Sequence, residues 1–232
     1  MRWVCVVLLW LGSTAFAEDT DLELVLLADA SGSIDAREIA FQLEGYAQAI
    51  TDPQVLEAIA RTAYGEIAVT YVEWATNQGV VVDWMRIRDA EDAERFAEAL
   101  RNGPRSAYGS NAIGAALLEG LRMMDENEMV GFRRVIDFSG DSVRNYTGPS
   151  IEEARTRVVA AGVTINALPI LRPDDPGRAQ GGLEDAYESQ IIGGPGAFVV
   201  TAEDRESFAE AVRRKLFLEI SDAGAGRVVA GN

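Results

Sequence analysis

The 232-residue sequence contains no histidine and only one cysteine, Cys5. The absence of histidine excludes Ser-His-Asp and Cys-His nucleophilic chemistry, and it excludes every histidine-liganded metal site. Cys5 lies in a leader that we expect to be removed, so the mature protein has no thiolate ligand either. A metal ion bound to this protein is therefore held by oxygen atoms, which favours Mg²⁺, with Mn²⁺ or Ca²⁺ as alternatives.

Lysine is scarce as well, because Lys215 is the only lysine among 21 basic residues, whereas 37 residues are acidic. The formal net charge is −16, and it becomes −17 when Arg2 is removed with the leader. A chain this acidic is repelled by phosphate backbones and by anionic lipid surfaces. We therefore expect neither nucleic acid nor a membrane surface as its partner.

No apolar run after residue 17 is long enough to span a bilayer. The first 17 residues have the parts of a secretory signal peptide: Arg2, the apolar run 3–11 and the cleavage motif Ala15-Phe16-Ala17. We expect an exported, soluble bacterial protein, periplasmic or secreted, that begins near Glu18. The rest of the chain fits one domain over 18–221, followed by a flexible tail over 222–232.

Strand-like and helix-like segments alternate along the chain. Six stretches have the composition of strands, namely Leu24–Leu27, Glu66–Trp74, Val80–Met85, Arg133–Phe138, Val163–Ile170 and Ala197–Val200. The short turn at 76–79 forces an antiparallel hairpin, which places the third strand at a sheet edge. The pattern predicts an α/β fold: a single doubly wound, mostly parallel six-stranded sheet with one antiparallel edge strand and helices on both faces.

The segment 22–33, LELVLLADASGS, organises the rest of the chain. Its apolar part is typical of a strand buried on both faces of a parallel sheet. It ends in the polar turn 29–33, after which a helical pattern opens with Ile39 and Leu43. Ligands of open α/β sheets bind at this carboxyl edge. The alternative is that Asp29 and the serines only form the turn and cap the helix.

Two further polar turns stand, like 29–33, at the end of a predicted strand or at the start of a predicted helix. Gly109-Ser110-Asn111 precedes a helix, and Ser139-Gly140-Asp141 follows the fourth strand. Together with the D-x-S-x-S string at 29–33, they resemble the von Willebrand factor type A (VWA) domain and its metal-ion-dependent adhesion site (MIDAS). That family carries D-x-S-x-S after the first strand, a Thr in a later loop and an Asp after the fourth strand.

The resemblance implies a role for each of five residues. Ser31 and Ser33 match the two direct hydroxyl ligands, and Asp29 matches the carboxylate that often acts through water. Ser110 stands where the family usually has Thr, which keeps the oxygen and loses a methyl group. Asp141 matches the last carboxylate, although the family's usual T-D-G is replaced here by a turn one residue longer.

Asp137 is the alternative to Asp141 as the last ligand. It stands inside a predicted buried strand, where an unpaired carboxylate is costly. We expect it to reach the metal or to pair with Arg133, with Arg134 or with a helix-start amide.

The ligand set implies binding without turnover, hence a non-enzymatic protein. Hydroxyls carry no charge, so Asp29 and Asp141 just neutralise a divalent ion, which stays electrophilic at its open position. The resemblance implies that a protein partner's carboxylate fills that position, as in adhesion. The loops 105–110 and 142–149 would frame it, with Arg105 and Arg144 steering the acidic group.

The strings RRVIDFSGD, TINALPI and IIGGPGAFVV resemble an exported, uncharacterised VWA-like family of alphaproteobacteria. Three other functions stay open. The string 138–142 with Asn145 is similar to the GDS esterases, which need a histidine base. A periplasmic solute binder would need two lobes. A VWA fold whose site has lost the metal would act as a scaffold.

Overall fold

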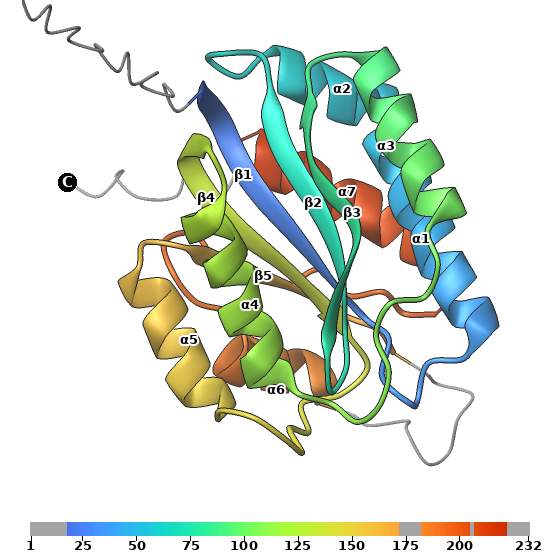
Figure 1. Ribbon diagram of the computed structural model, residues 1–232, viewed down its shortest axis with the longest axis vertical. Helices are drawn as coiled ribbons and strands as arrows, with labels where there is room; N and C mark the ends of the chain where they lie inside the picture. The colour runs from blue at the N-terminus through green and yellow to red at the C-terminus, as the bar shows by residue number, and fades with distance from the viewer. Residues whose placement is uncertain (1–17, 172–181, 205–206, 222–232) are drawn as a thin grey trace, which may run out of the picture.

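The computed structural model describes residues 18–171, 182–204 and 207–221 (Figure 1). Its elements in chain order are β1 (Glu18–Asp29), α1 (Ala36–Ile50), α2 (Pro53–Ala60), β2 (Ile67–Trp74), β3 (Gln78–Ile87), α3 (Ala90–Asn102), α4 (Ile113–Glu126), β4 (Met129–Gly140), α5 (Ile151–Ala160), β5 (Thr164–Pro169), α6 (Leu183–Gln190) and α7 (Phe208–Ile220). The predicted leader 1–17 and tail 222–232 lie outside the described residues. Within the ranges that the structure covers, no helix is both long and apolar enough to cross a membrane.

The strands form one mixed sheet in the order β3-β2-β1-β4-β5. β1 is central and pairs in parallel with β2 and β4, β4 pairs in parallel with β5, and β2 pairs with β3 in antiparallel. The register places Asp29 opposite Trp74 and Leu27 opposite Phe138. The prediction of an antiparallel edge strand is confirmed, and the ends of β1 and β4 meet at the same edge.

The prediction of six strands is wrong, since the sheet has five in the part of the chain that the structure describes. The segment around Val199 does run parallel to β5, but it makes only isolated bridges, from Ala167 to Val199 and from Ile170 to Ala202. The two bridges share one register, and Pro169 lies between them. Proline has no amide hydrogen to donate, so the ladder is interrupted at Pro169 and no continuous strand forms.

Helices cover both faces of the sheet, as predicted. α1, α2, α3 and α7 lie on one face, and α4, α5 and α6 lie on the other (Figure 1). Side chains of β1 alternate between the two cores, because Leu24 and Leu26 pack under the first group while Val25 and Leu27 pack under the second. β1 is therefore buried on both faces, which explains its unbroken apolar sequence.

A cluster of buried charges lies between β4 and α7. The Lys215 ammonium is 2.8 Å from Oδ2 of Asp137 and 2.6 Å from Oε1 of Glu219, and all three side chains are fully or almost fully buried. The Asn166 amide donates to Glu219 over 3.0 Å, and the Tyr46 hydroxyl donates to Asp137 over 3.4 Å. Asp137 therefore points toward α7 and not toward the polar turns.

The prediction that Arg133 or Arg134 pairs with Asp137 is wrong. Arg133 donates to the carbonyl oxygens of Glu219 and Ile220, at 2.7 and 3.0 Å, and so caps the end of α7. Arg134 pairs with Asp125 over 2.8 Å. Arg134 lies on the opposite face of β4 from Asp137, because successive strand side chains alternate, and the Asp137 carboxylate is paired with Lys215.

Candidate metal centre

The three polar turns meet at the carboxyl edge of the sheet. Asp29 is the last residue of β1, and the turn that follows is closed by the Ile34 amide, which donates to the Ser31 carbonyl over 2.8 Å. Asp35 then caps α1, with Glu38 completing a capping box. The cap fixes where α1 begins, so residues 31–33 form a short tight turn directly above the end of β1.

Four of the five predicted ligands form a continuous chain of contacts. Oδ1 of Asp29 accepts the Ser31 amide over 2.8 Å, and the hydroxyl oxygens of Ser31 and Ser33 lie 3.0 Å apart. The Ser33 hydroxyl lies 3.4 Å from Oδ1 of Asp141, at the end of β4. Two carboxylates and two hydroxyls thus converge from two strands that are distant in sequence.

The Ser110 loop joins this group through its backbone. The Gly32 amide donates to the Gly109 carbonyl over 2.7 Å, which sets the loop against the first turn. Gly109 has a φ of 107°, a left-handed conformation that favours glycine. The Ser110 side chain is exposed, and its amide donates to the Thr76 hydroxyl over 2.8 Å. Ser110 is therefore next to the cluster, and Thr76 anchors it there.

Asp29 has the most perturbed environment of the five residues. Its side chain is completely buried, and its Oδ2 has no hydrogen-bond partner among the described residues. Burial raises the pKa of Asp29 to about 7, and the negative charge of Asp141 adds to the rise, whereas hydrogen bonds from Ser31 and from the Asp141 backbone lower it. A buried carboxylate oxygen without a hydrogen-bond partner can be stabilised by a coordinated cation, and this oxygen is such an atom.

Space beside that oxygen is kept open by Gly140. A Cβ atom at this position would lie 3.0 Å from Oδ2 of Asp29, 3.0 Å from the Tyr187 hydroxyl and 2.9 Å from the Trp74 ring. Trp74 is fixed in place by its indole N–H, which donates to the Ser139 carbonyl over 3.1 Å. The lining of the site therefore depends on glycine one residue before Asp141.

The side chains that converge at the polar turns offer carboxylate and hydroxyl oxygens. No group of three or more Asp, Glu, His or Cys side chains gathers at a metal-binding distance within the described ranges. An ion at this site would take two carboxylates, Asp29 and Asp141, and would complete its shell with hydroxyl oxygens and water. Such an all-oxygen set suits Mg²⁺ or Mn²⁺.

Arg105 brings a positive charge to the edge of the site. Its guanidinium donates to the carbonyl oxygen of Ala30 and, over 3.3 Å, to that of Ser31. It also lies over the Tyr108 ring, 5.0 Å from the centroid. Arg144, the second predicted steering residue, is exposed in the loop after Asp141.

Sequence reasoning missed the residues that fix the 105–110 loop. Buried Glu73, near the end of β2, accepts the amides of Ser106 and Ala107 through Oε2 at 2.5 and 3.1 Å. Thr76 holds Ser110 as described above. The signal that could have found Glu73 is its position, since an acidic residue inside an apolar, β-branched strand needs hydrogen-bond donors when buried.

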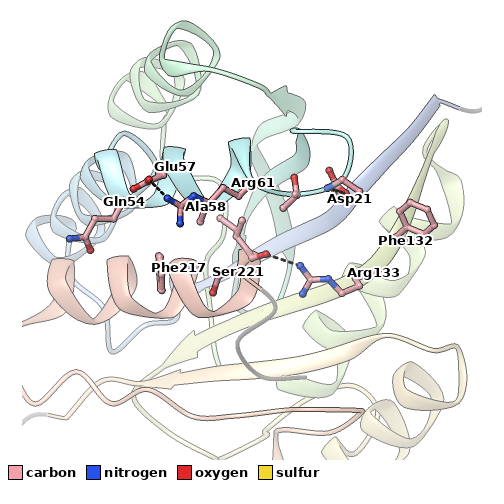
Figure 2. Close-up of a pocket in the computed structure, with 12 residues that line it drawn as sticks. Asp21, Gln54, Glu57, Ala58, Arg61, Phe132, Arg133, Phe217 and Ser221 are labelled. Atoms are coloured by element: carbon pink, nitrogen blue, oxygen red, sulfur yellow. Dashed lines mark hydrogen bonds and ion pairs between the residues drawn. The ribbon is translucent and has the colours of Figure 1, made fainter. Parts of the chain in front are cut away.

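A cavity of about 540 Å³ lies at the opposite edge of the sheet, between α2 and the end of α7 (Figure 2). Its charged side chains already have partners within the protein. Asp21 accepts the amides of Ala63 and Tyr64 at 2.9 and 2.8 Å, and Arg61 pairs with Glu57. Arg133 caps α7. Among the described residues no unpartnered charged side chain lines this cavity, so we assign the site to the polar turns.

Comparisons with known proteins agree with this fold. The family described as "Protein of unknown function (DUF1194)" matches residues 19–224. No curated protein matches the chain. Among solved structures, the chain is similar to proximal thread matrix protein 1 of the mussel byssus, with zinc occupying its MIDAS motif (16% identity, TM-score 0.59), over 89% of this chain and 46% of that one.

Two bacterial structures are also similar. The von Willebrand factor type A protein of Catenulispora acidiphila has 17% identity and a TM-score of 0.58, over 92% of this chain and 44% of that one. The vWF domain of the pilus tip protein Mfa5 of Porphyromonas gingivalis has 11% identity and a TM-score of 0.57, over 91% and 98%. The chain spans about half the length of the mussel and Catenulispora proteins. The chain belongs to the DUF1194 family and has the fold of a von Willebrand factor type A domain.

Proposed function

We propose that this protein is an exported, adhesion-type VWA module that binds a divalent cation at a MIDAS-like site and captures an acidic group of a protein partner. Asp29, Ser31, Ser33, Ser110 and Asp141 would hold the cation. The observation that carries the proposal is the buried Oδ2 of Asp29, which has no hydrogen-bond partner among the described residues. It belongs to a carboxylate that lies close to Asp141 and is joined to it through the Ser31–Ser33 turn.

The nature of the ion follows from the ligands. The similar mussel protein has zinc in its MIDAS motif, which supports a divalent ion on this fold. Zinc sites in proteins are dominated by sulfur and nitrogen ligands, whereas this chain offers hydroxyls and two carboxylates. We propose Mg²⁺ as the resident ion, with Mn²⁺ or Ca²⁺ as substitutes.

Capture of a carboxylate follows from the charge balance at the site. Two carboxylates neutralise a divalent ion without surplus negative charge, so a further acidic ligand is still attracted. Arg105 adds positive charge next to the turn. A similar structure is a domain of a pilus tip protein, which favours a partner-binding module outside the cytoplasm. In this proposal residues 1–17 are a signal peptide, and residues 18–221 form the domain.

The hydrolase alternative is disfavoured by the surroundings of Ser142, the serine of the string Gly140-Asp141-Ser142. Its hydroxyl accepts the Arg144 amide over 3.0 Å, a contact that closes the local turn. A serine nucleophile must reach its substrate and have a base within hydrogen-bond distance. The chain has no histidine to act as that base.

A pull-down tests the proposal. Protein spanning 18–232 is immobilised and incubated with envelope extract in two buffers that differ only in containing millimolar Mg²⁺ or EDTA. We expect a protein retained with Mg²⁺, released by EDTA and lost in Asp29→Asn. Asp83→Asn, at an exposed position of β3, is the matched control. The proposal would be contradicted if the same protein were retained in the presence of EDTA and by Asp29→Asn.

A further inference from the structure

We propose that the cavity between α1 and α3, next to the turn at 31–33, receives an apolar side chain of the same partner that supplies the carboxylate. The inference rests on the proposed function and specifies its partner. The partner would be a protein segment in which an acidic residue lies about three residues from a leucine-like residue. Recognition then needs two points, one at the ion and one in the cavity.

The cavity has a volume of about 530 Å³, within the range of small ligand pockets. It is lined by Ala36, Ile39, Ala40, Leu43, Glu44, Arg101, Gly103 and Arg105. Its apolar wall is one face of α1, since residues 36, 39, 40 and 43 follow helical spacing. Alanine at two of these four positions leaves the space that longer side chains would fill.

The cavity lies next to the turn at 31–33, because one residue contacts both. Arg105 lines the cavity and also donates to the carbonyl oxygens of Ala30 and Ser31 in the turn. Ala36, at the near end of the cavity, follows Ser33 by three residues, so their Cα atoms are at most about 11 Å apart. An extended segment advances about 3.3 Å per residue, so about three residues bridge the two points.

The charges around the cavity favour an acidic partner. Arg101 is paired with Glu44 and Glu94, at 2.9 and 3.0 Å, so its positive charge at the far end is already compensated within the protein. Arg105 at the near end pairs with no carboxylate among the residues that the structure describes. It is therefore a local positive charge in a chain whose formal net charge is −16. A segment would therefore place its acidic residue near Arg105 and its apolar residue deeper, along α1.

Synthetic peptides test this inference directly. Each has one aspartate in a Gly/Ser background, with leucine at one of the five positions on either side, and one peptide has no leucine. Binding to the 18–232 protein is measured by fluorescence anisotropy with Mg²⁺ and with EDTA. We expect leucine two to four residues from the aspartate to strengthen Mg²⁺-dependent binding about tenfold, the effect of burying much of one such side chain.

Variants locate the effect. Ala40→Trp fills the cavity from the exposed side of α1, so it should remove the gain from leucine and leave the leucine-free peptide unaffected. Ala36→Trp fills the same cavity from the preceding turn and serves if Ala40→Trp folds poorly. Gln48→Trp, exposed on α1 outside the cavity, is the matched control and should keep the gain.

The outcomes separate the two proposals. Mg²⁺-dependent binding of every aspartate peptide without a leucine effect overturns the cavity inference and leaves the proposed function standing. A leucine effect that persists in both tryptophan variants also overturns it. Failure of every aspartate peptide to bind in a Mg²⁺-dependent way overturns both proposals.

Discussion

The Ser33 hydroxyl lies 3.4 Å from Oδ1 of Asp141, 108 residues further along the chain. This contact joins the end of β1 to the end of β4, and Asp29 lies fully buried beneath it. The described protein supplies no partner to Oδ2 of Asp29, and Asp141 repels its charge. The pair of turns is therefore an arrangement that a cation would stabilise.

The first prediction concerns Asp29. With millimolar Mg²⁺ the wild-type Tm should rise, because a ligand at a hundredfold excess over its Kd stabilises the folded state by about 2.7 kcal/mol. Asp29→Asn should abolish that rise. It should also raise the metal-free Tm above pH 7, since it removes a buried negative charge that no cation compensates in the metal-free protein, and the Asn side chain can still accept the Ser31 amide. Differential scanning calorimetry with Mg²⁺ or EDTA checks both effects, and an equal Mg²⁺ response in the two proteins would refute the site.

The second prediction separates Asp141 from Asp137. Asp141→Asn should weaken Mg²⁺ binding in a calorimetric titration and leave metal-free urea unfolding nearly unchanged. Asp137→Asn should instead destabilise the metal-free protein by about 3 kcal/mol, because Lys215 loses one of its two buried carboxylate partners. The reverse pattern would transfer the ligand role to Asp137.

The third prediction is a pH dependence. Burial raises the pKa of Glu219 to about 7 from its usual 4.5, with Asp137 adding to the rise and Lys215 opposing it. Between pH 4.5 and 7 the unfolded chain has lost this proton and the folded chain retains it, so the free energy of unfolding falls as pH rises. Asn166 and Tyr46 complete the polar surroundings.

Because burial also raises the pKa of Asp29 to about 7, the test compares variants and not pH values alone. Glu219→Gln should make the metal-free fall in stability between pH 4.5 and 7 smaller than in the wild type. Glu98→Gln, exposed on α3, should leave the fall unchanged. Urea unfolding at four pH values in EDTA measures the difference, and identical slopes in all three proteins would contradict the assignment.

The fourth prediction concerns Glu73, which positions the loop without touching the ion. Glu73→Ala removes the acceptor of the Ser106 and Ala107 amides, at a cost of about 1–3 kcal/mol in stability. We expect Mg²⁺ affinity to fall as well, because Ser110 belongs to the same loop. Glu73→Gln keeps one acceptor oxygen and should restore most of the affinity. A loss of stability with unchanged Mg²⁺ affinity would limit Glu73 to a structural role.

The predictable parts of the fold are those that depend on the order of apolar and polar residues within a short segment. The apolar run before Asp29 and the strand–helix alternation gave the parallel sheet with two covered faces. The short turn at 76–79 gave the antiparallel edge strand. Proximity of the turns at 31–33 and 141 followed from sheet topology alone, because parallel strands end at one edge.

The errors arose where one side chain overrides a pattern. Val199 lies in an apolar run that is typical of a strand, and Pro169 on the neighbouring strand prevents a continuous ladder. Proximity in sequence favours an arginine partner for Asp137, whereas its ion-pair partner is Lys215, on the helix that crosses this part of the sheet. The alternation of apolar and polar side chains within a strand indicates which of them are buried. Which residue of another element packs against a buried side chain depends on the path of a helix that is distant in sequence.

The burial of Lys215 has a chemical consequence. Its ε-amino group is the only one in the chain, and its side chain is completely inaccessible in the fold. Reagents and enzymes that acylate lysine therefore find no target in the native protein. Acylation of Lys215 requires α7 to separate from the sheet, so its rate under native conditions measures how often that helix opens. Acylation at the single lysine therefore reports on local unfolding at α7.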